Sequence, residues 1–232
     1  MAGADGRVGV GFRVSDRRWF GALTATGPTV SEPERFDEQF GLVGRGGILL
    51  ATEQIDNTYN VQVGANDTYV SNTPDQGAAT RPRSPFRFRD RPELRLDGTR
   101  LVDTGVVDAD NVGVYGVEAG AQYRNVFVQA EHFWFDVERG HSPLANPSFK
   151  GGYAEASWIL TGEFRRHNIA TGSFQNPRPC RAFSPTNGGF GAFELAARYS
   201  YRDSRFPPRR GGHRGDPWRD PRWRTAHRHA GP

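Results

Sequence analysis

The chain has 232 residues, of which 36% are hydrophobic, and it contains no apolar run long enough to form a transmembrane helix. Its single cysteine, Cys180, cannot close an intrachain disulfide, and its histidines lack the spacing of a zinc site, so we expect no metal and no cofactor. The formal net charge of +4 comes from the C-terminal end, because residues 201–232 carry nine Arg and three Asp, whereas residues 1–200 carry 21 basic and 23 acidic side chains.

The first strong pattern along the chain is an alternation of apolar and polar residues over residues 57–69, with a weaker copy at 44–53. One face of residues 57–69 would hold Tyr59, Val61, Val63, Ala65 and Tyr69, and the other would hold Thr58, Asn60, Gln62, Asn66 and Thr68. A period of two residues is typical of β-strands. The glycine-rich residues 44–47 lack the Lys-Ser/Thr of a phosphate-binding loop and indicate a turn or the start of a strand.

Residues 81–96 form the most distinctive charged motif. If this stretch is extended, Arg87, Arg89, Arg91, Glu93 and Arg95 lie on one face, and each same-face neighbour follows the last at about 6.6 Å. A file of guanidinium groups favours an anion-binding or pore-lining role, because such groups match oxyanions and let an ion pass from site to site. The alternative is an edge strand that its charges protect from aggregation. Three prolines exclude the stretch from the middle of a paired sheet, so it is an edge, a barrel rim or a loop inside a lumen.

Four further segments show the alternation, clearly at 111–124 and 193–202 and more weakly at 125–139 and 152–163. In the first, the faces are Tyr115, Val117, Ala119, Ala121 and Tyr123 against Gly116, Glu118, Gly120, Gln122 and Arg124. In the last segment, Phe193, Leu195, Ala197, Tyr199 and Tyr201 oppose Glu194, Arg198 and Arg202. The sequence therefore predicts an all-β, antiparallel meander.

Such a meander fits either a membrane barrel with its apolar face outward or a soluble β-sandwich with that face inward. The apolar faces carry small residues in their middle and Tyr at their ends, whereas a soluble core would place its large aromatics centrally. Tyr115 and Tyr123 would lie roughly 27 Å apart along a strand, close to the separation of two aromatic belts once the strand is tilted. This spacing favours the barrel.

From about Arg202 the composition changes to Arg, Pro, Gly, His and Trp without a period, which predicts a disordered tail at 205–232 after a β-domain at 1–204. The tail has three interpretations: a basic arm for RNA or lipid headgroups, a solvated tail, or a GC-rich gene translated in the wrong frame. The last is favoured. The opening residues have no apolar region of the kind a signal peptide needs, so we expect a truncated and frameshifted piece.

Five segments carry a family resemblance: residues 17–28, 86–95, 98–105, 153–163 and 188–200. Together they resemble the phosphate-selective porin O/P family of Gram-negative outer membranes. The resemblance implies a sixteen-stranded, trimeric outer-membrane β-barrel with inward loops and an arginine ladder, of which Arg87, Arg89, Arg91 and Arg95 resemble a part. The family also uses basic residues from the earlier half of the barrel, and these are not evident in this chain. At about twenty residues per strand and loop, eight to ten strands would remain.

The function expected from these features is passive diffusion of small anions, phosphate above all, in contact with outer-membrane lipid and without nucleic acid. The alternative is a soluble β-domain whose basic tail, residues 202–228, binds nucleic acid. Enzymatic pairs could be drawn from Glu131 with His132, or Glu163 with His167, but no motif fixes their geometry, so we expect no enzyme.

Overall fold

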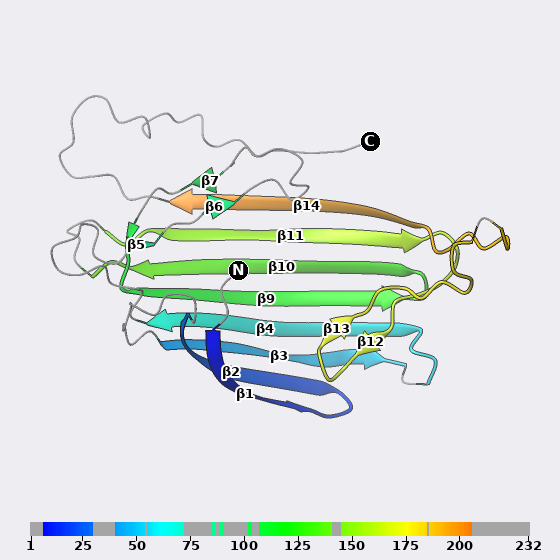
Figure 1. Cartoon of the computed structure of the whole chain (residues 1–232), viewed down its shortest axis with the longest axis horizontal. Helices are drawn as coiled ribbons and strands as arrows, with labels where there is room; N and C mark the ends of the chain where they lie inside the picture. The colour runs from blue at the N-terminus through cyan, green and yellow to red at the C-terminus, as the bar shows by residue number, and fades with distance from the viewer. Residues whose placement is uncertain are drawn as a thin grey trace, which may run out of the picture.

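The computed structural model describes residues 7–29, 40–53, 55–71, 85–86, 89–90, 102–103, 107–140, 145–184 and 186–205, and these are all strand, turn or irregular structure without a helix. Eight antiparallel strands form the main sheet (Figure 1). In sheet order they are β1 (Arg7–Ser15), β2 (Trp19–Thr29), β3 (Phe40–Thr52), β4 (Tyr59–Ser71), β9 (Asn111–Tyr123), β10 (Val126–Glu138), β11 (Ser148–Ile159) and β14 (Glu194–Arg205). The predicted all-β meander is confirmed.

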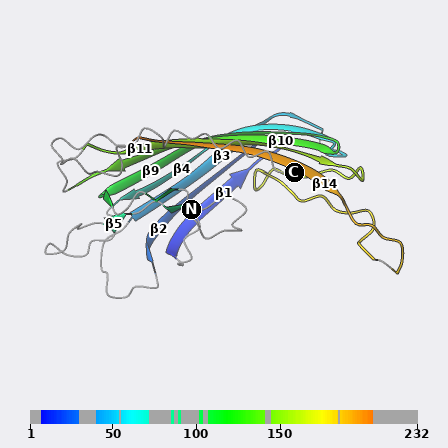
Figure 2. The same ribbon diagram turned by 90° about the horizontal axis from the view of Figure 1, so that it is seen from above.

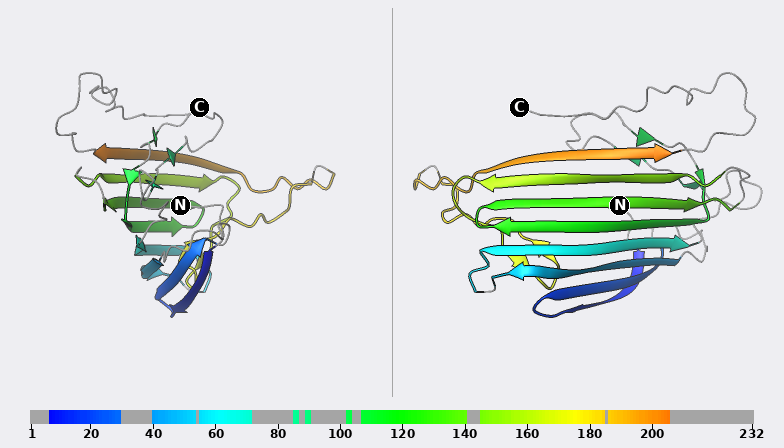
Figure 3. Two further views of the ribbon diagram at one scale, coloured as in Figure 1. Left: turned by 60° about the vertical axis from the view of Figure 1, so that its left-hand side comes forward. Right: turned by 180° about the vertical axis from the view of Figure 1, so that it is seen from behind.

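Three small two-stranded sheets accompany the main one. They pair β5 (Pro85–Phe86) with β8 (Val107–Asp108), β6 (Arg89–Asp90) with β7 (Val102–Asp103), and β12 (His167–Asn168) with β13 (Ser173–Phe174). Figure 2 shows the main sheet as one curved layer, and the strands fan out with a twist in Figure 3. Within the described residues β1 does not pair with β14, so the sheet is not closed into a barrel.

The two ends of the sheet differ in the lengths of their connections. At one end, short turns join β1 to β2, β3 to β4 and β9 to β10. Arg124, in the turn between β9 and β10, has a φ of +50°. At this same end the longer segment 160–193 joins β11 to β14. The β3–β4 turn is built around Glu53, whose carboxylate accepts hydrogen bonds from the backbone N–H groups of Ile55, Asp56 and Thr58. These hydrogen bonds, the one from Asp56 above all, lower the pKa of Glu53 from its usual value.

The two faces of the sheet have opposite chemistry, as the alternation predicts. In β4, β9, β10 and β14 the register places Val63, Ala119, Ala130 and Ala197 on one face, hereafter the outer face. Its large apolar side chains are exposed, with Val117 at 47% and Trp134 at 42%. On the opposite inner face, polar side chains such as Asn60, Gln62 and Gln122 are at most 4% exposed. A soluble sheet would show the reverse, so this arrangement favours a wall between lipid and water.

Two segments cover the inner face. Near the end opposite the tight turns, Val107 and Ala109 pack against Val112, Val137 and Phe149 in a small apolar cluster. Near the tight turns, residues 167–174, hereafter the inner hairpin, fold back over β3 and β4 (Figure 1). The inner hairpin brings side chains and carbonyls from distant parts of the chain together on the inner face.

Candidate functional site

Arg45 is the centre of a polar cluster on the inner face. It lies in the middle of β3, and the register pairs Arg45 with Asn66 in β4 and Gly64 with Glu118 in β9. Arg45 donates from Nε to Glu118 Oε2 at 3.1 Å and from Nη2 to Glu118 Oε1 at 2.8 Å. Gly64 lies in between, and a Cβ there would come within 2.8 Å of Glu118 Oε1, so the missing side chain leaves room for the ion pair.

The same guanidinium group binds the inner hairpin. Arg45 donates from Nη1 to the carbonyl of Thr171 and from Nη2 to the carbonyl of Gly172, each at 2.9 Å. Its guanidinium carbon lies 5.3 Å from the centre of the Phe20 ring, within the range of a cation–π contact. Arg45 therefore joins β2, β3, β9 and the hairpin, although 126 residues separate it from Thr171.

Glycine is required at position 172 for two reasons. Its φ of +56° lies in the left-handed region, which favours glycine. A Cβ at Gly172 would also come within 2.0 Å of the Phe20 ring, so any side chain would push the hairpin away from the wall. Gly172 therefore permits the close contact between the hairpin and Phe20.

Gln62 and His167 form the second half of the cluster. Gln62 donates from Nε2 to Glu118 Oε1 at 3.0 Å and to the Gly172 carbonyl at 3.2 Å, and its Oε1 contacts His167 Nε2. Because an amide oxygen only accepts, we assign the ring proton to His167 Nε2. The backbone N–H of His167 donates to Asn57 Oδ1, and Asn57 Nδ2 donates to the His167 carbonyl. Burial, with a smaller contribution from the charge of Arg45, lowers the pKa of His167 from 6.5 to about 4.

Aromatic contacts hold the other side of the hairpin. The Phe174 ring lies 5.0 Å from Phe127 and 4.9 Å from the His167 ring, measured between centroids. Gly120 lies beneath it, since a Cβ there would come within 2.7 Å of Phe174. The hairpin is thus packed as well as hydrogen-bonded.

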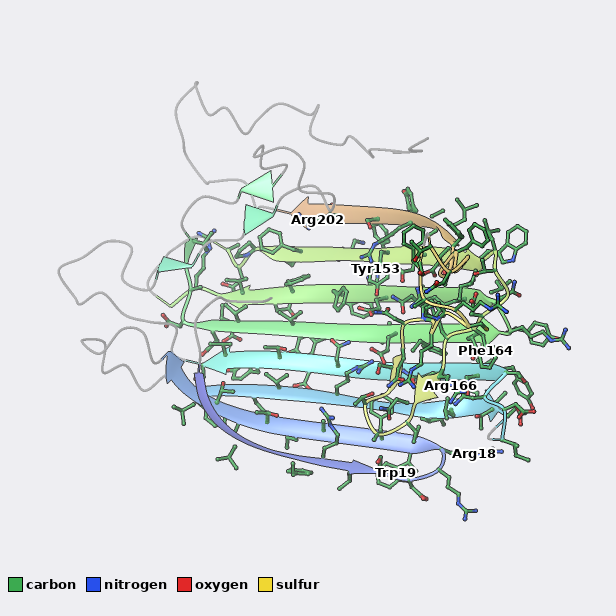
Figure 4. The ribbon with its side chains drawn as sticks, turned by 45° about the vertical axis from the view of Figure 1, so that its right-hand side comes forward. Arg18, Trp19, Tyr153, Phe164, Arg166 and Arg202 are labelled. Atoms are coloured by element: carbon green, nitrogen blue, oxygen red, sulfur yellow. The ribbon has the colours of Figure 1, made fainter. Side chains whose placement is uncertain are left out.

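Two further arginines also contact glutamates: Arg198 on the inner face and Arg165 in segment 160–193. Arg198 pairs with Glu155 at 3.0 Å and lies over the Tyr153 ring, which is labelled in Figure 4. Arg165 pairs with Glu194 at 2.6 Å. Each of these positive charges, like that of Arg45, has a negative charge beside it, so the three pairs together add no net charge to this face.

An open pocket lies at the end of the sheet that carries the tight turns. It is lined by Ile55, Asp56, Asn57, Thr58, Phe164 and Arg166. The last two come from segment 160–193 and are labelled in Figure 4. The pocket brings Asp56 and Arg166 to one opening.

The predicted site residues Arg87, Arg91 and Arg95 lie outside the described residues. For Arg89 only the backbone is described, and it pairs with Asp103 between β6 and β7. The structure therefore neither joins nor separates the four arginines of the predicted row.

Sequence reasoning missed Arg45, and it misread the glycines around it. Residues 44–47 are neither a turn nor the start of a strand, because they lie within β3, which runs from Phe40 to Thr52. The side chain of Arg45 lies on the inner face, where it pairs with Glu118. Its signal was an arginine alternating with apolar and small residues. His167 and Thr171 carry no comparable signal, since their role depends on a contact distant in sequence.

The candidate acid/base pairs are not brought together. Glu131 accepts a hydrogen bond from Tyr153 on the inner face, whereas His132 contacts Tyr201 and Trp134 on the outer face. Glu163 contacts Thr161 and the Cys180 backbone N–H, and these hydrogen bonds, that of Thr161 first, lower its pKa. His167 binds Gln62 instead.

The described ranges contain neither a metal-binding cluster nor a membrane-spanning helix. No three His, Cys, Asp or Glu side chains there are grouped so that they could hold a metal ion. No helix in the same part of the chain is long and apolar enough to cross a membrane.

Comparison with known proteins gave two matches. The sequence model of a family described as "Phosphate-selective porin O and P" matches residues 5–213. An uncharacterised protein of Caulobacter vibrioides is 34% identical over 117 residues, which are 50% of this chain and 22% of the relative. The matched part of this chain therefore spans about a fifth of that relative's length.

Proposed function

The chain belongs to the phosphate-selective porin O and P family, and we propose that it forms wall strands of an outer-membrane pore through which small anions, phosphate above all, diffuse passively. Members of such a family are channels rather than enzymes. The observation that carries the proposal is the inverted arrangement of the sheet, with Val117 and Trp134 exposed on one face and Gln62 and Gln122 buried on the other. In water the outer face would be an extended apolar surface, whereas lipid would cover it without cost.

The lengths of the connections indicate which end of the sheet faces the periplasm. Outer-membrane barrels carry short turns on the periplasmic side and long loops outside. We therefore propose that the end with the turns at 16–18, 53–58 and 124–125 faces the periplasm. Segment 160–193, which leaves the sheet at this end, would then enter the pore from the periplasmic side.

The proposed anion-guiding residues are Arg87, Arg89, Arg91 and Arg95. Arg45, Arg165 and Arg198 are paired with glutamates and add no net charge to the pore, whereas the face with Arg87, Arg89, Arg91 and Arg95 holds one acidic residue, Glu93, and so keeps a net positive charge. In an extended stretch Arg87, Arg89 and Arg91 follow one another at about 6.6 Å and Arg95 lies about 13 Å beyond Arg91, so the row offers successive weak sites along which an anion can move. The barrel would contact outer-membrane lipid through its outer face and assemble as a homotrimer. Residues 206–232 lie outside the described residues, so the tail at 205–232 stays a prediction.

The test is the current through the full-length protein in a planar lipid bilayer. Under a salt gradient the reversal potential should show anion preference, and added phosphate should reduce the chloride current. Replacing each of Arg87, Arg89, Arg91 and Arg95 in turn by Ala should weaken both effects, because each loses a charge-assisted contact of about 1.5 to 3 kcal/mol, partly screened by water.

The matched control is Phe88→Ala, which lies on the opposite side of an extended stretch. It should leave selectivity unchanged. Cation preference in the parent, or no ion-conducting channel at all, would contradict the proposed function. Arginine variants that conduct like the parent would show only that the row does not line the pore.

A further inference from the structure

We infer that Arg45 and Glu118 form a latch that holds the inner hairpin against the wall and so keeps the water-filled space beside it narrow. This inference rests on the proposed function, since only in a pore does the hairpin's position control flow. Arg45 acts in it as a positioning residue, because its contacts are with protein groups.

The first argument is the way Arg45 divides its donors. One side of the guanidinium group, Nε and Nη2, is held by the Glu118 carboxylate, and this fixes the direction in which Nη1 and Nη2 meet the hairpin. The two groups that they bind, the carbonyls of Thr171 and Gly172, are backbone acceptors at the turn of the hairpin. One guanidinium group that donates hydrogen bonds on two sides can hold the sheet and the hairpin together.

The charge of Arg45 is neutralised by a buried glutamate. Glu118 is only 8% exposed in its side chain, and its partners are Arg45 and Gln62. If an anion replaced Glu118 on Arg45, a buried carboxylate would lose its cation, which is a costly state. The ion pair with Glu118 therefore prevents Arg45 from binding a passing anion, although 37% of the Arg45 side chain is exposed.

The third argument is that the hairpin has little stability of its own. Its two strands, β12 and β13, pair over only two residues each, and such short hairpins are marginal in water. Its position must therefore come from contacts with the wall, chiefly those of Arg45 and Gln62, with Gly172 against Phe20 and Phe174 over Gly120.

The experiment compares three variants that break the latch by different routes. Arg45→Ala removes the donor, Glu118→Gln removes the charge that orients it, and Gly172→Val pushes the hairpin from Phe20. The control is Arg198→Ala, which removes an Arg–Glu pair of the same face without touching the hairpin. Breaking charge-assisted hydrogen bonds should raise the population of released hairpin about 10- to 100-fold.

Two readouts follow the release in the full-length protein. A nitroxide on Ala170→Cys, in a Cys180→Ser background, reports the mobility of the hairpin turn, where Ala170 is exposed. Single-channel conductance in a bilayer reports the width of the pore. All three latch variants should increase both mobility and conductance, and Arg198→Ala should leave the nitroxide as immobile as in the parent.

Opposite effects of the two charge variants would overturn the latch. If Arg45→Ala lowers anion preference and Glu118→Gln raises it while the nitroxide stays immobile, Arg45 is a charged pore residue instead. An unchanged nitroxide in Gly172→Val and Glu118→Gln would also overturn it, even if Arg45→Ala failed to fold. The nitroxide measurement does not depend on ion conduction. The latch can therefore be contradicted while the porin function is supported, and the porin function can be contradicted while the latch is supported.

Discussion

His167 illustrates at the scale of a single residue how the inner hairpin depends on a neutral side chain. His167 is 8% exposed and its ring contacts Gln62, Asn57 binds its backbone, and Arg45 carries a charge nearby. A proton on this ring would add a second cation in a nearly closed space. Both burial and Arg45 therefore favour the neutral form.

The pH dependence follows from the sign of this change. Because the folded pKa of His167, about 4, lies below the unfolded value of about 6.5, the stability that neutral His167 contributes is complete above pH 6.5. It is lost as the pH falls from 6.5 towards 4. We expect the free energy of unfolding, measured by urea titration of the full-length protein in lipid vesicles, to fall by on the order of 1 kcal/mol per pH unit there.

His167→Gln should remove this loss between pH 7 and pH 5. His132→Gln, on the outer face, should keep it. A His167 ring that titrates near 6.5 in an NMR experiment would contradict the buried, neutral state.

At the scale of the elements, the alternation is what the sequence predicts best. The two faces of β4, β9 and β14 are those that the period-two pattern predicts, because a one-residue slip would exchange every side chain between lipid and the interior. The same alternation is present in β1, where Val8, Val10 and Phe12 are exposed and glycines lie between them. The segments expected from the alternation do not include this strand. Its pattern is readable in the sequence.

The hairpin and its contacts could not be predicted in the same way. Arg45 and Thr171 are 126 residues apart, and no local pattern indicates which connection folds inward. The choice is made by complementary shapes, such as Gly172 against Phe20 and Gly120 beneath Phe174, which a sequence shows only as scattered glycines.

Val117 tests the assignment of the faces at the middle of β9. Val117→Arg would put a guanidinium group into lipid, which costs about 2 to 4 kcal/mol near the midplane of a barrel wall. The expected loss is measured as the free energy of unfolding by urea titration in lipid vesicles. Ser200→Arg, on the inner face of β14, is the control and should cost much less. Equal losses of unfolding free energy in the two variants would show that the two faces do not meet different surroundings, lipid on one side and water on the other.

At the scale of the whole molecule, eight strands form a curved sheet whose two edge strands, β1 and β14, do not pair with each other in the described residues. The eight strands of the main sheet in the described residues lie within the expected range of eight to ten. A transmembrane barrel has no free edges, because lipid offers the backbone no hydrogen bonds. The family assignment, with its match over residues 5–213, supports a closed barrel as the setting of this sheet.

If the sheet is a barrel wall, its outer face meets lipid and its inner face meets water. Ala196 and Ala197 are neighbours in β14, pair with Ser157 and Ala156 of β11, and point to opposite faces. Each is replaced by Cys in the Cys180→Ser protein, which is reconstituted in lipid vesicles and treated with a charged, water-soluble thiol reagent. We expect rapid labelling of Ala196→Cys and protection of Ala197→Cys. Equal labelling of the two, or the reverse order, would contradict it.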